Sequence, residues 1–90
     1  MSGAGGATDD ERWLVVDGRR WRRQDPALPE EVAATLKSHL GRGRSRGERR
    51  RTDLAKRGLG ERGTPWWEQT AAERRERWER SLAELEALDD

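Results

Sequence analysis

The clearest alternation of apolar and polar positions lies in residues 12–23, where two short runs flank an Asp-Gly pair. Asp17 and Gly18 suit the positive φ angles of a two-residue type I′ turn, and the flanking Val, Leu and Trp residues favour strands. We therefore expect a β-hairpin in which Leu14 pairs with Trp21 and side chains alternate between two faces. One face carries Leu14, Val16 and Trp21, and we expect it to dock on helices as a core face. The other face carries Trp13, Val15, Arg20 and Arg22.

Apolar residues three and four positions apart, which share one face of a helix, occur in residues 29–40, 48–59 and 71–88. The expected apolar faces consist of Val32, Ala33, Leu36, Leu40, Leu54, Ala55, Leu59, Ala71, Trp78, Leu82 and Leu85. Between the first two helices, residues 41–47 interleave glycine with arginine, which weakens a helix and predicts a flexible segment. Residues 1–11 are rich in glycine and small residues, and we expect them to form a disordered tail.

Adjacent tryptophans follow a turn-forming run of glycines in residues 58–63. Thr64 and Pro65 favour a helix start, and residues 70–73 match a capping box, so the helical region 65–88 is expected to break near residue 70. Neighbouring residues on a helix diverge by about 100°, so Trp66 and Trp67 cannot both face one core. One indole should be buried, and the other should lie against another segment, a partner or solvent.

These elements predict a mainly α fold, a small α+β domain over residues 12–90 in which an N-terminal β-hairpin docks on about three helices. The large apolar residues are nine Leu, three Val, five Trp and one Met, with no Ile, Phe or Tyr. Because a small domain with so few large apolar residues has a thin core, we expect completion by self-association or by a partner.

Charge is balanced overall but uneven along the chain. Lys and Arg total 19 against 18 Asp and Glu, yet residues 12–23 carry five arginines and one aspartate. Residues 42–62 carry nine basic and three acidic residues, whereas residues 63–90 carry four basic and eight acidic ones. Most of the cations are arginine, which suits bidentate contacts with phosphate or carboxylate. A codon bias toward arginine would produce the same composition without a function.

Several function classes lack the residues that they require. The chain has no cysteine and a single histidine, His39, so neither a disulfide framework nor a metal cluster is expected. No apolar run reaches the ~18 residues of a membrane span, and no signal-peptide pattern opens the sequence, so we expect a cytoplasmic protein. Residues 58–63 match G-x-G-x-x-G but follow a helix rather than a strand, which argues against a dinucleotide site. We expect no enzyme activity, no catalytic residue, no cofactor and no small-molecule ligand.

Two binding hypotheses remain, and both use Trp and Arg side chains. The first is a non-enzymatic interaction protein that binds a protein partner or itself, since Trp and Arg are enriched in binding hot spots. The second is nucleic-acid or polyanion binding through the hairpin and the segment between Arg42 and Arg62. On the hairpin, arginine could equally pack on Trp13 as a structural cation–π pair. The candidate interaction residues are Trp13, Arg20, Arg22, Arg62, Trp66, Trp67 and Glu68.

Three short blocks carry a family resemblance: W-L-V-V-D-G-R-R-W-R from Trp13, D-P-x-x-P from Asp25, and A-K-x-x-L-G-E-R-G-x-P-W-W-E from Ala55. In these blocks the chain resembles a family of small uncharacterised proteins of high-GC bacteria, some of which carry the label "biopolymer transporter Tol". The resemblance runs from about Trp13 to Leu85 and implies no established activity. A Tol component would show export or membrane features, or would be a much larger β-protein, and the sequence predicts neither.

Overall fold

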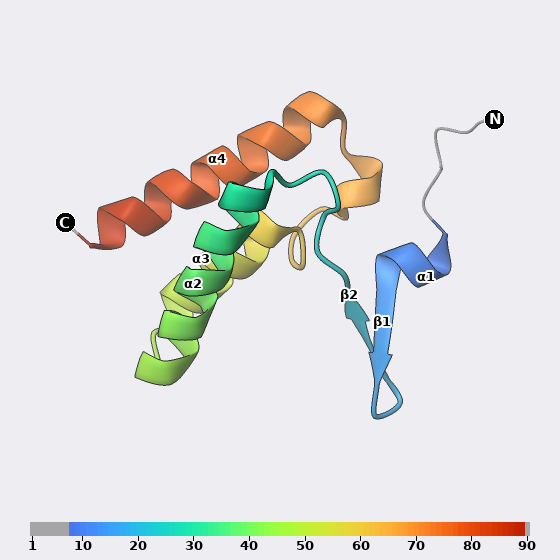
Figure 1. Ribbon diagram of the computed structural model, residues 1–90, viewed down its shortest axis with the longest axis horizontal. Helices are drawn as coiled ribbons and strands as arrows, with labels where there is room; N and C mark the ends of the chain where they lie inside the picture. The colour runs from blue at the N-terminus through green and yellow to red at the C-terminus, as the bar shows by residue number, and fades with distance from the viewer. Residues whose placement is uncertain (1–7, 90) are drawn as a thin grey trace.

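The computed structural model describes residues 8–89 and shows a mainly helical protein with an N-terminal hairpin, which confirms the expected fold class (Figure 1). In chain order the elements are α1 (Asp9–Arg12), β1 (Trp13–Val16), β2 (Arg19–Arg22), α2 (Glu30–Arg46), α3 (Arg49–Leu59), the 3-10 turn η2 (Trp66–Glu68) and α4 (Ala71–Leu88). Helices α2 and α3 form a helical hairpin (Figure 1). Helix α4 packs along α3, with Arg77 beside Gly58 at one end of α3 and Asp89 beside Arg51 at the other. None of the helices within residues 8–89 combines the length and the apolar content needed to cross a membrane.

The hairpin has the register that its turn predicts. Leu14 pairs with Trp21 and Val16 with Arg19 in an antiparallel ladder. Asp17 and Gly18 adopt φ angles of 52° and 77°, as a turn with two left-handed residues requires.

The predicted disordered tail covers residues 1–11, of which residues 1–7 lie outside the described part of the chain. For the remainder the prediction is wrong, because Asp9–Arg12 forms the helical turn α1. Its start is a capping box in which Glu11 accepts a hydrogen bond from the Thr8 backbone N–H at 2.9 Å. That hydrogen bond lowers the pKa of Glu11.

The predicted flexible segment 41–47 is also helical, because α2 continues through Arg46. The glycines serve packing here: a Cβ on Gly43 would lie 2.9 Å from the backbone nitrogen of Thr52 in α3. A glycine at this crossing lets the two helix backbones approach closely, which offsets its low helix propensity. Gly47, with φ 69°, then ends the helix in a left-handed conformation.

The core lies where α2, α3 and α4 meet. Its buried residues are Leu36, Leu54, Ala55, Leu59, Trp78 and Leu85, with Leu28, Val32, Leu40 and Leu82 partly buried around them. The apolar residues predicted to line the three helices are therefore buried or partly buried, except Ala71, which is exposed at the start of α4. The predicted break is also present, since Thr70 begins α4 with a capping box after the short turn η2.

A buried ion pair ties the segment after the hairpin to α4. The Asp25 carboxylate is fully buried and accepts from Arg77 Nη2 at 2.7 Å, from Arg74 Nη1 at 3.4 Å and from the Ala27 backbone N–H at 2.8 Å. The Asp25 backbone N–H donates to the carbonyl of Leu59 at 2.8 Å. These contacts satisfy a carboxylate that would otherwise be very costly to bury, and they fix the direction in which the chain leaves the hairpin.

Candidate interaction site

The hairpin's apolar face lies outside the core, contrary to the sequence prediction. Leu14, Val16 and Trp21 remain 42%, 46% and 46% exposed, and this face looks onto an open groove instead of packing on a helix. The physical reason is that the hairpin docks by its base and through residues of its opposite face. That docking leaves the apolar side of β1 and β2 free.

The docking contact is a cluster of three tryptophans. Trp66 is buried, and its Nε1 donates to the carbonyl of Arg23 at 2.9 Å. Trp67 is half-buried and packs edge-on against both Trp66 and Trp13, with ring centroids 5.1 Å and 5.6 Å away. The two adjacent indoles therefore diverge as expected: Trp66 faces the domain interior, and Trp67 holds the hairpin.

Arginines complete this docking contact. The guanidinium groups of Arg12 and Arg22 lie 5.2 Å and 5.7 Å from the ring centroid of Trp67. Arg22 also donates through Nη1 to the carbonyl of Gly63 at 2.9 Å. Cation–π packing together with a hydrogen bond across 41 residues of sequence fixes the base of the hairpin to the loop before η2.

Two further arginines lie over the two indoles of the hairpin. Arg20 lies 4.3 Å from the centroid of Trp13, and Arg19 lies 4.9 Å from the centroid of Trp21. The geometry thus contains the structural cation–π pair that the sequence offered as one alternative for Trp13 and Arg20.

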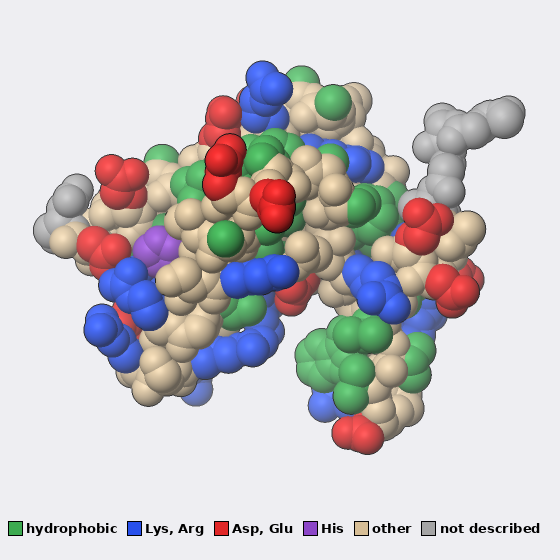
Figure 2. Space-filling model, in the orientation of Figure 1, with side chains coloured by type: hydrophobic (Ala, Val, Ile, Leu, Met, Phe, Trp, Pro, Cys, Tyr) green, Lys and Arg blue, Asp and Glu red, His purple; other side chains and the backbone are tan. Residues whose placement is uncertain are grey.

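Between the hairpin and the helices lies an open groove of about 1190 Å³. In Figure 2, hydrophobic side chains gather on the hairpin, and Lys or Arg side chains lie across the gap from them. The lining residues are Asp10, Glu11, Leu14, Val16, Trp21, Arg22, Arg23, Gln24, Pro26, Arg44, Lys56 and Glu61. One wall is therefore apolar, and Arg44 of α2 and Lys56 of α3 bring positive charge from the helical side.

Glu61 lies at the inner side of this groove, directly after α3. Burial raises the pKa of its carboxyl, and the positive charges of Lys56, Arg44, Arg62 and Lys37 oppose that increase. Glu61 therefore holds its negative charge less readily than an exposed glutamate does. Sequence reasoning missed Arg44, Lys56 and Glu61 as partners of the hairpin because nothing in their spacing relates them to residues 12–23.

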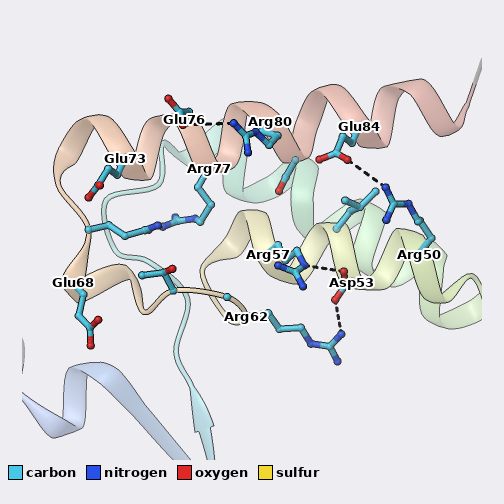
Figure 3. A pocket seen from close by; sticks show the side chains of 15 residues that line it. Arg50, Asp53, Arg57, Arg62, Glu68, Glu73, Glu76, Arg77, Arg80 and Glu84 are labelled. Atoms are coloured by element: carbon cyan, nitrogen blue, oxygen red, sulfur yellow. Dashed lines mark hydrogen bonds and ion pairs between the residues drawn. The ribbon is translucent and has the colours of Figure 1, made fainter.

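Of the other two predicted interaction residues, Arg62 lines a small pocket with Trp13, Arg20 and Arg22, and Glu68 lies on another surface. Arg62 donates to Asp53 at 2.8 Å, Arg57 donates to the same carboxylate at 2.9 Å, and both hydrogen bonds lower the pKa of Asp53. Glu68 is exposed and lines a cleft between α3 and α4 (Figure 3). The charged side chains of this cleft are five arginines and five carboxylates, so its charges cancel. The structure brings Trp13, Arg20, Arg22, Trp66 and Trp67 together, places Arg62 in a pocket beside the first three, and leaves Glu68 outside that cluster.

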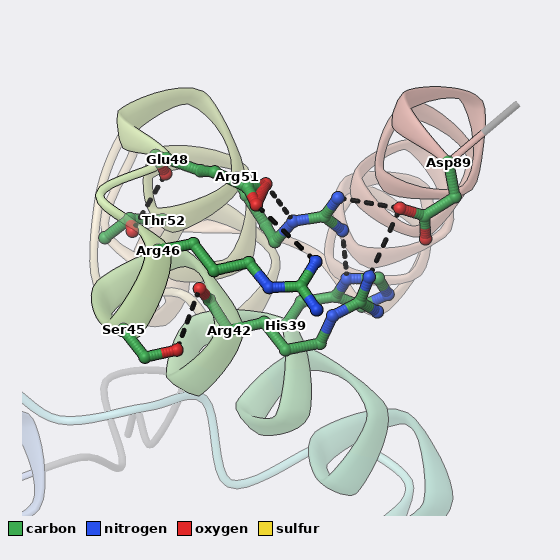
Figure 4. A network of polar contacts seen from close by, with 8 residues as sticks. All are labelled: His39, Arg42, Ser45, Arg46, Glu48, Arg51, Thr52 and Asp89. Carbon is green, nitrogen blue, oxygen red and sulfur yellow. Dashed lines mark hydrogen bonds and ion pairs between the residues drawn. The ribbon is translucent and has the colours of Figure 1, made fainter.

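A second polar network joins the C-terminal half of α2, the first turn of α3 and the C-terminal end of α4 (Figure 4). Arg51 is buried and donates to Glu48 Oε2, Asp89 Oδ1 and His39 Nδ1 at 2.7, 2.7 and 2.8 Å. Burial and the positive charges of Arg51 and Arg42 lower the pKa of His39, while Asp89 opposes them. The neutral His39 ring accepts from Arg51, so in this structure the histidine joins helices together.

Within residues 8–89, no group of three or more His, Asp or Glu side chains could hold a metal ion. The arrangement offers contacts of three kinds: apolar packing, ion pairs and cation–π stacking. No known protein family matches this chain, and neither a curated protein nor a solved structure matches it.

Proposed function

We propose that this chain is a small non-enzymatic interaction protein that binds a protein partner through the apolar face of its hairpin. The observation that carries the proposal is the position of the exposed apolar residues. Of the five large hydrophobic side chains that are exposed within residues 8–89, three share one face of the hairpin: Leu14, Val16 and Trp21. A contiguous apolar face on an otherwise highly charged surface is typical of a binding site.

The rigidity of the hairpin's base supports the same proposal. The tryptophan cluster and the hydrogen bond from Arg22 to Gly63 hold the base in place, so the apolar face is presented in a fixed orientation. A preorganised surface loses less conformational entropy on binding than a loose one does.

Ion pairing of the arginines in residues 42–62 weakens the case for nucleic-acid binding. Six of them take part in ion pairs with carboxylates: Arg42, Arg46, Arg50, Arg51, Arg57 and Arg62. A guanidinium that already neutralises a carboxylate contributes less to phosphate binding, because the carboxylate must be separated from it or remains nearby as a repulsive charge.

Cross-linking in cells of the source organism tests the proposal. The face variant, Leu14→Thr/Val16→Thr/Trp21→Thr, removes the apolar face, and Val15→Thr changes an equally apolar residue on the opposite face. We expect wild type and Val15→Thr to yield the same cross-linked protein species, and the face variant to lose it while keeping its helical circular dichroism. A cross-linking pattern that is identical for all three proteins would refute the proposal.

A further inference from the structure

The groove carries charge as well as apolar surface, and that charge indicates what kind of partner fits. We infer that the groove takes an acidic segment of a partner protein, with apolar residues of the segment on the hairpin and carboxylates facing Arg44 and Lys56. This inference rests on the proposed function, because it concerns the same face of the hairpin.

Arg44 and Lys56 are the positive charges of the groove that are available to a partner. Neither takes part in an ion pair within the described chain. The other two lining cations already have acceptors: Arg22 donates to the carbonyl of Gly63, and Arg23 donates to the carbonyls of Asp10 and Trp13. A carboxylate opposite Arg44 or Lys56 would gain a charge partner without breaking an existing one.

The carboxylates of the groove do not cancel this preference. Glu11 is engaged in the capping box with Thr8, and Asp10 lies beside it in α1, at the base of the hairpin. Arg44 lies near the C-terminal end of α2, and the α2–α3 turn points the same way as the hairpin tip (Figure 1). Glu61 lies near Lys56, and burial makes the negative charge of Glu61 costly. The groove is therefore acidic at its base and positive along its helical wall.

A second copy of this chain fits the groove less well. Arg19 shares the apolar face and Arg22 and Arg23 line the groove, so two hairpins packed face to face would bring these three arginines of each copy together. Like charges in a partly desolvated interface repel strongly, and little salt reaches them there.

Nucleic acid also fits less well. Two of the four lining cations already donate to backbone carbonyls, and Arg20 lies over the indole of Trp13. Leu14 and Val16 add an aliphatic surface that offers neither a stacking platform nor a phosphate contact.

A random-peptide display library, selected on the purified full chain with counter-selection on the face variant, tests the inference. We expect enriched peptides to combine Asp or Glu with large apolar residues. Synthetic versions should lose affinity about tenfold or more on Arg44→Glu/Lys56→Glu and should bind more weakly as salt rises. Arg75→Glu is the matched control, since Arg75 is exposed on α4 and forms no ion pair with another residue between 8 and 89, and it should leave affinity unchanged.

The remaining outcomes separate this inference from the proposed function. Peptides that need Leu14, Val16 and Trp21 but lack acidic residues, or that tolerate the Arg44→Glu/Lys56→Glu change, overturn the inference and leave the proposed function standing. No hairpin-dependent peptide overturns both. Sedimentation velocity tests the two other possible occupants of the groove. A dimer of the wild-type protein that is absent in the face variant would identify a second copy as the occupant. A DNA duplex whose sedimentation coefficient rises with the wild-type protein but not with the face variant would identify nucleic acid. Either result overturns the inference.

Discussion

The helical part of the molecule and the hairpin use the same residue types in opposite ways. Around α2, α3 and α4, leucines are buried, and arginines such as Arg51 and Arg77 join segments through several hydrogen bonds each. On the hairpin, Leu14 and Val16 are exposed, and the guanidinium groups of Arg19 and Arg20 form cation–π contacts with indole rings. Burial of apolar surface between the helices therefore stabilises the fold, whereas the hairpin leaves its apolar side chains on the surface.

Breaking the buried ion pair should have the largest effect on the helical side. Arg77→Ala leaves Arg74, at the longer distance, as the one charged partner of the fully buried Asp25 carboxylate among the described residues, so we expect a loss of about 3–5 kcal/mol in the free energy of unfolding. Urea denaturation followed by circular dichroism measures it. Arg80→Ala is the matched control, because Arg80 forms an exposed pair with Glu76 on the same helix and should cost less than about 1 kcal/mol. Equal losses in the two variants would mean that the Asp25 contact adds little.

Leucine truncation compares the two regions directly. Leu36 is fully buried in the core, so Leu36→Ala should cost about 2–5 kcal/mol through lost burial and a residual cavity. Leu14→Ala removes the same atoms from an exposed position and should cost about 1 kcal/mol or less. Thermal and urea unfolding of both variants give the values. A Leu14→Ala loss as large as that of Leu36→Ala would show that the hairpin face is part of the core in solution.

A pair of glycines tests whether residues 41–46 are an ordered helix. Gly43→Ala places a Cβ against the Thr52 backbone and should cost about 1–3 kcal/mol through overpacking. Gly41→Ala meets nothing within 4 Å on the same helix and should stabilise the protein by about 0.5–1 kcal/mol, because alanine favours helix over glycine. Similar small changes from both substitutions, measured by urea denaturation, would favour the flexible segment that the sequence predicted.

The smallest expected effect is a dependence of stability on pH through His39. Its pKa in the folded protein is lowered below the ordinary 6.5, so the unfolded chain binds the proton first as pH falls. The free energy of unfolding should therefore decrease from about pH 7 downward, until the pH passes the lowered pKa of the folded state.

The variant His39→Asn isolates this effect, since its side-chain oxygen can still accept from Arg51 and does not titrate. The difference in stability between wild type and variant should change between about pH 7 and 5. Glu61, whose raised pKa acts in the opposite direction at lower pH, cancels in that difference. A difference that is constant over this range would show that burial and the neighbouring arginines do not lower the pKa of His39 in the folded protein.

The sequence by itself determined the local elements. Asp17 and Gly18 specify the hairpin register, the spacing of Leu54 and Leu59 gives α3 its buried face, and the capping box at Thr70 begins α4. Each of these features depends on residues within a few positions of one another, where turn geometry and helical periodicity act. The divergence of Trp66 and Trp67 belongs to the same class, because adjacent side chains must point in different directions.

Only the tertiary structure decided which face of the hairpin is buried and what lies opposite it. Arg22 meets Gly63 across 41 residues, Arg23 meets Trp66 across 43, and Asp25 meets Arg77 across 52. Alternation along a strand gives two faces but not the element that covers either one, and an arginine-rich sequence does not say which arginines find carboxylates. The packing of the helices and the position of Trp67 decide which hairpin face is covered and which arginines pair with carboxylates. The apolar face of Leu14, Val16 and Trp21 is left open because the indole that anchors the hairpin lies on its other side.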